Sequence, residues 1–190
     1  MKTYIYILLF AFFGIQISFA QSTEQKNLKI SKNSRLYITG DTNINSFNCK
    51  FNSDELPDHL KVIYNKQQNA LTFKNTTLKL NSKAFDCGSR PINKDFEALM
   101  KAEKFPYILL NLKKLQFKNL KSAEITIEIN IAGVTKQFEV PVQIDQTTSN
   151  YKGTILLNIN DFKLEPPKKV FGLIKVKEEI QIEFDLYFEN

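Results

Sequence analysis

A strict alternation of apolar and polar residues is the feature that most constrains the fold of this chain. Between residues 125 and 131, isoleucine occupies every second position, and threonine, glutamate and asparagine fill the positions between. Successive side chains of a β-strand point to opposite faces, so this pattern is typical of a strand with one buried face. The pattern recurs at residues 138–142, 155–159 and 180–188. The sequence therefore predicts strands that each bury one face.

Short turns are expected between these strands, because Gly40-Asp41, Gly133 and Ser149-Asn150 lie at their boundaries. A bulge is expected near Asn75, where the apolar positions change parity. Eight or nine strands without a βαβ rhythm indicate an antiparallel, all-β fold. We expect a closed barrel of about eight strands, with a two-sheet sandwich as the alternative. The other predicted strands are 35–39, 43–51, 61–64, 70–80 and 107–112.

One segment has helical periodicity instead. Within residues 92–112, Phe96, Leu99 and Met100 recur at spacings of three and four, which places them on one face of a helix. Asn93 is predicted to be its N-cap, because its side-chain oxygen can accept an unpaired backbone N–H. A single helix in a strand-rich fold must lie on the barrel wall or cover one opening. The sequence leaves both arrangements open.

The N-terminus is typical of a secretory signal. Lys2 precedes an apolar run, and Ser18-Phe19-Ala20 places small residues where cleavage occurs. We therefore expect residues 1–20 to be a signal peptide, 21–32 a polar lead-in and 33–190 the barrel domain. An uncleaved anchor is the alternative, and no second membrane span is expected. The expected location is outside the cytoplasm, in the periplasm.

Two cysteines, Cys49 and Cys87, follow this segment. In an oxidising compartment an isolated pair favours a disulfide, and two separate buried thiols are the alternative. No metal site is expected, because His59 is the only histidine and no Cys-x-x-Cys spacing occurs. The net charge of +6 is modest, and acidic residues border the lysine clusters. No nucleic-acid partner is therefore expected.

Residues that would support catalysis are scarce. The chain has no G-x-S-x-G motif, no Gly-rich phosphate loop and no histidine partner for a nucleophile. The candidate carboxylates are Asp41, Asp86, Asp95 and Asp161, and turn or capping roles account for each of them. We therefore expect no enzymatic activity and no cofactor.

Four segments occur in an order that is similar to a known family: GDTNINSFNCKF, DFEALMKAEKFPYILLNL, IAGVTKQFEVPV and FGLIKVKEEIQIEFDL. Together they resemble the YceI-like family of secreted proteins, in the cysteine-containing form of Bacteroidetes-type bacteria. The resemblance covers about residues 33–188. It implies an extended, lipocalin-like barrel of eight antiparallel strands with an apolar interior. It also implies that a polyisoprenoid or similar long-chain lipid binds along that interior.

Strand faces that are rich in isoleucine and leucine suit such a ligand. Burying a lipid chain against them gains about 25 cal/mol for each Å² of apolar surface removed from water. The alternative is a structural or interaction barrel of the cell envelope, whose interior is filled by its own side chains. The identity of the lipid and the formation of a homodimer are left open. The residues expected to line the interior are Phe47, Phe73, Leu99, Met100, Ile108, Leu110, Ile127, Phe138, Val140, Leu157, Ile182 and Phe184.

Overall fold

Eleven strands join in one antiparallel sheet in the computed structural model, which describes residues 23–166 and 176–189. They are β1 (Thr23–Ile30), β2 (Arg35–Thr42), β3 (Ser46–Phe51), β4 (His59–Gln67), β5 (Ala70–Asn81), β6 (Phe85–Asp86), β7 (Tyr107–Asn119), β8 (Ser122–Ile131), β9 (Val134–Asp145), β10 (Asn150–Asn158) and β11 (Val176–Glu189). The helical elements of this described part are α2 (Arg90–Leu99), η1 (Ser53–Glu55), η2 (Ser82–Ala84) and η3 (Ile159–Phe162).

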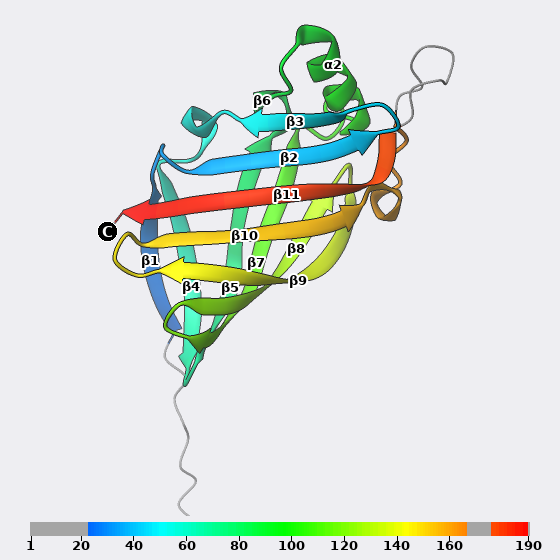
Figure 1. Ribbon diagram of the computed structural model, residues 1–190. Coiled ribbons are helices and arrows are strands. Elements are labelled where there is room, and N and C mark those ends of the chain that lie inside the picture. The colour runs from blue at the N-terminus through cyan, green and yellow to red at the C-terminus, as the bar shows by residue number, and fades with distance from the viewer. Residues whose placement is uncertain (1–22, 167–175, 190) are drawn as a thin grey trace, which may run out of the picture.

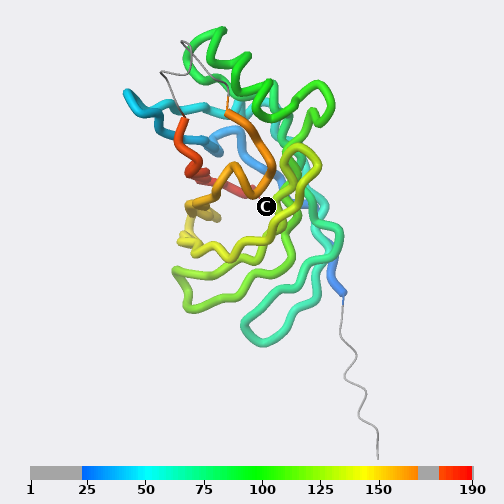
Figure 2. The backbone as a smooth tube through the Cα atoms, turned by 90° about the vertical axis from the view of Figure 1, so that its right-hand side faces the viewer, coloured from blue at the N-terminus to red at the C-terminus, as the bar shows by residue number. Residues whose placement is uncertain are grey.

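The pairing of β1 with β11 closes eight strands into a ring, in the order β1, β4, β5, β7, β8, β9, β10 and β11. This closing contact is short, because only Lys29 and Ile30 pair with β11. Along most of β11 the neighbour is β2, which extends the sheet through β3 to β6. Figures 1 and 2 show the strands surrounding one interior. The predicted all-β, eight-stranded antiparallel barrel is confirmed, and a two-sheet sandwich does not form.

The two ends of the barrel are built differently. The closed end, as we name it, comprises α2, residues 100–105, the β8–β9 turn at 132–133, and η3 with its following residues 163–164. The open end comprises the turns at 68–69, 120–121 and 146–149, which join β4 to β5, β7 to β8 and β9 to β10. Figure 1 shows α2 and these turns on opposite sides of the molecule. The interior between the two ends is the candidate site.

Strand β1 corrects the predicted domain boundary, since residues 21–32 were expected to be a lead-in outside the barrel. Seven residues of β1 pair with β4, from Thr23 opposite Asn65 to Lys29 opposite His59. Its sequence, TEQKNLKI, has little apolar alternation, so the periodicity that marks the other strands is absent. Backbone pairing with β4 makes this segment a strand, although its sequence lacks the apolar alternation that would predict one. Residues 1–20, predicted to be a signal peptide, lie outside the described residues.

The predicted bulge in β5 is present. Asn75 has a positive φ of 51°, and the register with β7 shifts between Thr72 and Thr76. The shift allows Leu71 and Phe73 before it, and Leu78 after it, to face the same interior despite their opposite parity. The bulge therefore keeps one apolar face along a bent strand.

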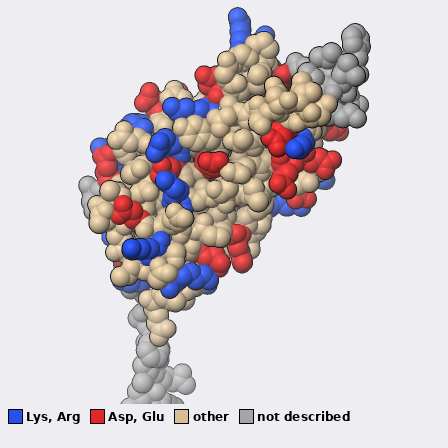
Figure 3. All heavy atoms as spheres, in the orientation of Figure 1, with Lys and Arg blue, Asp and Glu red and all other residues tan. Residues whose placement is uncertain are grey.

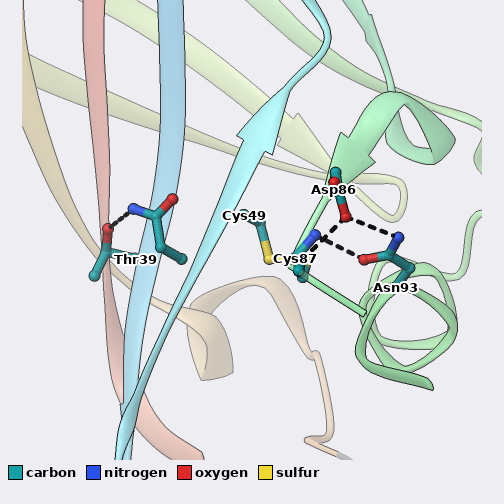
Figure 4. The surroundings of a disulfide bond; sticks show 7 residues. Thr39, Cys49, Asp86, Cys87 and Asn93 are labelled. Atoms are coloured by element: carbon teal, nitrogen blue, oxygen red, sulfur yellow. Dashed lines mark hydrogen bonds between the residues drawn. A yellow bond between two sulfur atoms is a disulfide. The ribbon is translucent and has the colours of Figure 1, made fainter. Parts of the chain in front are cut away.

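Helix α2 begins earlier than predicted, and Asn93 is not its N-cap. The N-cap is Ser89, and Pro91 lies in the first turn, where its fixed φ and missing N–H are tolerated. The Asn93 side chain instead accepts a hydrogen bond of 2.7 Å from the backbone N–H of Cys87. Its amide also donates to Asp86 at 3.2 Å. Asn93 thus ties α2 to the chain that precedes it (Figure 4).

Candidate functional site: the barrel interior

The inward faces of the strands form two apolar clusters. The larger cluster lies toward the closed end and contains Phe51, Met100, Ile129 and Phe162 among its buried members. The smaller lies toward the open end, and its buried members are Leu115, Ala123, Val142 and Ile144. Ile125 and Phe184, both partly buried, pack against both clusters. The interior therefore has one continuous apolar lining.

All twelve residues predicted to line the interior belong to these clusters. Phe73 packs against the cluster at the open end, and the other eleven belong to or pack against the larger cluster. The ten of them that lie on strands share a face because residues directly opposite in a ladder point the same way, as Ile127 and Phe138 do. Their contact with a ligand remains a prediction. The fully or nearly buried members are Met100, Ile108, Ile127, Val140, Leu157 and Ile182.

At the closed end the interior is filled by protein. Ile159 and Phe162 of η3 are 0% exposed, and the Phe162 ring stacks on Phe138 with centroids 6.3 Å apart. Figure 2 shows the η3 segment crossing this end, with α2 along its edge. Lys101 joins the two by donating a hydrogen bond of 3.1 Å to the carbonyl of Lys163. This end offers little space to a ligand.

Helix α2 packs into this closed end through the residues that its periodicity indicated. Phe96 and Met100 are 5% and 2% exposed, and Leu99 packs partly buried against the same cluster. The Phe96 ring lies 5.1 Å from Phe85 of β6. Of the two predicted arrangements, the helix contributes to the cover of an opening.

A disulfide fastens α2 to the sheet. Cys49 of β3 and Cys87, just before α2, are joined by a bond of 1.99 Å, which confirms the predicted pair (Figure 4). Both cysteines are buried, at 0% and 6% exposure. The bond closes a loop of 38 residues that includes β4 and β5, so it holds the closed end together.

Four aromatic side chains at the open end are only partly buried: Phe73, Phe117, Tyr151 and Phe188. Phe73 lies 6.1 Å from the Tyr64 ring, and Phe188 lies edge-on to Tyr151 at 5.5 Å. Phe117 packs against the smaller cluster and is also partly exposed. Burial raises the pKa of Tyr151 above its ordinary value. Solvent therefore reaches apolar surface here, whereas the closed end is sealed.

The inner face of β1 adds polar groups to this open end. The register places Glu24 opposite Tyr64 and Lys26 opposite Val62, on the face that looks into the barrel. The Tyr64 hydroxyl donates a hydrogen bond of 2.7 Å to Glu24. This bond raises the pKa of Tyr64, and burial and the negative charge of Glu24 act in the same direction. Sequence reasoning missed this pair because β1 was not recognised as a strand.

The candidate carboxylates are dispersed over four elements, with Asp41 in β2, Asp86 in β6, Asp95 in α2 and Asp161 in η3. Asp41 accepts a hydrogen bond from Ser46 at 2.8 Å and pairs with Lys177, and both interactions lower its pKa. Asp86 accepts from the backbone of Gly88 at 3.0 Å, and this bond is the largest cause of its lowered pKa. These bonds are those of turns and ion pairs, so they give the carboxylates structural roles.

Two hollows can be described on the outside of the sheet, with volumes of about 540 and 300 Å³. Both include Arg35, whose guanidinium donates to Asp185 at 2.8 Å. Most of the residues that line them are polar or charged, so they suit a long apolar ligand less well than the interior does. Figure 3 shows basic side chains more often at the left of this outer face and acidic ones more often at the right.

Across residues 23–166 and 176–189, no three His, Cys, Asp or Glu side chains converge as a metal site would require. Over the same ranges, no helix has the length and apolar character needed to cross a bilayer.

A family model described as the YceI-like domain matches residues 31–188. This chain belongs to the YceI-like family. The match covers all of the ring except β1 and the last residue of β11, which agrees with the segments that suggested the resemblance. A search of curated proteins found no match.

Solved structures share the fold of this YceI-like protein. BcnA of Burkholderia cenocepacia is 15% identical, with a TM-score of 0.61 over 81% of this chain and 95% of its own. A polyisoprenoid-binding domain from Saccharophagus degradans is 10% identical, with a TM-score of 0.62 over 87% and 99%. The YceI protein of Campylobacter jejuni is 16% identical, with a TM-score of 0.51 over 62% and 74%. At these identities the likeness concerns the fold.

Proposed function

We propose that this protein binds a polyisoprenoid or another long-chain lipid in its barrel interior, and sequesters or transports it in the periplasm. The observation that carries the proposal is the continuous apolar lining, which Ile125 and Phe184 extend between the two clusters. A long hydrocarbon chain needs such a lining and few polar groups. The family membership supports the same ligand class, as does the likeness to a polyisoprenoid-binding domain.

The open end is the proposed entrance. Its aromatic side chains are partly exposed, whereas Ile159 and Phe162 block the closed end. A lipid tail that enters past Phe73 and Phe117 would replace water on their exposed surfaces, which is the favourable term for binding. The chain needs no catalytic group for this role, and we propose no enzymatic activity.

The periplasmic location is supported by the apolar N-terminal segment and by the disulfide between Cys49 and Cys87, because disulfides persist in oxidising compartments. Cell fractionation with intact-mass measurement tests it. A mature protein that begins at Gln21 in the periplasmic fraction is the expected result. A cytoplasmic protein of full length would contradict it.

Lipid binding is tested by native mass spectrometry and organic extraction of protein purified from its own cell envelope. Leu109 and Leu110 give a matched pair, because both are partly exposed neighbours on β7 and only Leu110 packs against the interior cluster. Leu110→Gln should reduce the lipid retained by about tenfold, since bound lipid would bury the amide against hydrocarbon, where it lacks hydrogen-bond partners. Leu109→Gln should leave retention unchanged.

Absence of lipid from the wild-type protein would favour the alternative, a barrel filled by its own side chains. Equal retention by both variants would place any bound lipid outside the interior, and would also reject the proposal.

A further inference from the structure

The most exposed large apolar side chain described in residues 23–166 and 176–189 is at the open end. Leu120 is 75% exposed at the tip of the β7–β8 turn. The turn is held by a hydrogen bond of 2.8 Å from the backbone N–H of Lys121 to the side chain of Asn119. One exposed leucine on a protein surface needs no explanation. Leu120, however, lies beside an opening that is lined by apolar residues, and this position indicates a role at that opening.

The turns of the open end and the strand ends beside them carry several lysines. Lys118 and Lys121 flank Leu120 in the sequence, and Lys66 lies just before the neighbouring β4–β5 turn. Lys118 pairs with Glu124 at 3.3 Å, whereas no ion pair of Lys66 or Lys121 is formed within the described part of the chain. The open end therefore presents an apolar tip together with two cations that are available to an anionic partner.

The turns of the open end form one connected rim. The backbone N–H of Phe117 donates to the carbonyl of Asn69 at 2.8 Å, which joins the β7–β8 turn to the β4–β5 turn. The backbone N–H of Ile144 donates to Lys121 at 2.8 Å and joins it to the end of β9. These bonds fix Leu120 beside the entrance that Phe117 lines. Lys26 adds a further cation on the inner face of β1.

We infer that the open end docks on an anionic lipid surface, with Leu120 inserted at the interface and Lys66 and Lys121 at the level of the head groups. An apolar tip flanked by lysines is the arrangement that interfacial binding requires, because hydrocarbon enters the bilayer while the ammonium groups contact lipid phosphates. The docked barrel turns its entrance toward the bilayer. A lipid can then pass between membrane and interior without crossing water. That purpose rests on the proposed function, whereas the docking itself does not.

Vesicle flotation tests the docking. Wild-type protein should float with vesicles of phosphatidylglycerol and phosphatidylethanolamine, and not with phosphatidylcholine vesicles. Leu120→Ser should weaken the apparent affinity by about tenfold. Lys66→Gln and Lys121→Gln should each weaken it by about fivefold, the value of one lysine near an anionic surface.

Matched controls separate docking by the rim from general attraction of a basic protein. Leu156 is 58% exposed on the side of β10, and Lys50 and Lys79 are exposed on β3 and β5. Leu156→Ser, Lys50→Gln and Lys79→Gln should float like the wild type. Equal losses in these controls, or no flotation of the wild type, would overturn the inference.

Lipid retention, measured by extraction, distinguishes this inference from the proposed function. Leu120 belongs to neither interior cluster, so Leu120→Ser should keep any lipid already bound. If the wild-type protein floats but contains no lipid, the docking inference would stand and the proposal of lipid binding would be rejected.

Discussion

Phe184 of β11 lies directly opposite Gly153 of β10, and its ring fills the space that a side chain at residue 153 would need. A Cβ added to Gly153 would lie 2.5 Å from the Phe184 Cζ atom and 3.0 Å from the carbonyl oxygen of Pro141. The same relationship joins Gly40 to Phe47, where the distance would be 2.4 Å. A glycine therefore lets a phenylalanine ring lie flat along the inner wall.

We predict that Gly153→Ala displaces the Phe184 ring and destabilises the barrel by about 1–3 kcal/mol, the usual cost of overpacking. Urea unfolding measures this change. Because the clash is between two residues, Phe184→Leu should relieve part of it, so the double variant should be more stable than the sum of the single effects implies. Strict additivity would show that Gly153 is needed for another reason.

The disulfide is expected to contribute about 4 kcal/mol to stability, because it closes a loop of 38 residues in the unfolded chain. Replacement of both Cys49 and Cys87 by alanine should lower the free energy of unfolding by this amount. Unfolding of the wild type with and without a reductant gives an independent measure. An unchanged midpoint in the double variant would contradict the prediction.

Asp185 should make the stability of the fold decrease in acid. Burial alone would raise its pKa, but hydrogen bonds from Asn150 and Arg35 outweigh burial and lower the pKa. The positive charge of Lys152 acts in the same direction. The unfolded carboxyl therefore binds its proton more readily, at its ordinary pKa of about 3.9. Its contribution to stability is complete above that pH and is lost as pH falls through the lower folded pKa.

Asp185→Asn should cost about 1–3 kcal/mol at pH 7, typical of hydrogen bonds to a charged group. The difference from the wild type should shrink toward pH 3 in unfolding measurements. Asp58 is the control, because its side chain is 78% exposed in a pair with Lys32. A constant difference across this pH range would contradict the assignment.

The fold was predictable where one face of a strand is apolar. The isoleucines of β8 and the parity change at Asn75 determined strands and a bulge without any long-range information. Pattern reasoning failed for β1, whose inward positions include Glu24 and Lys26. It also placed a turn at Gly40, which lies within β2. Glycine at this position leaves room for the Phe47 ring across the ladder and does not mark a turn.

The residue types of the candidate site were predictable from the sequence. Which end of the barrel is closed and which is open was not. Alternation identifies the inward face, but the difference between the ends depends on contacts between distant segments. The stacking of Phe162 on Phe138 is one such contact, and it seals the closed end. Phe162 lies outside every strand and helix that the sequence predicted, so periodicity carried no signal of this role.

The two ends should respond differently to truncation of their apolar side chains. Met100 is 2% exposed at the closed end, so Met100→Ala should destabilise the fold by about 2–5 kcal/mol through the cavity it leaves. Phe117 is partly exposed at the open end, so Phe117→Ala should cost less stability and release more of the bound lipid. Urea unfolding and lipid extraction of the same samples measure both effects. If Met100→Ala released lipid from a stable protein, α2 would be the gate, and the entrance would lie at its end of the barrel.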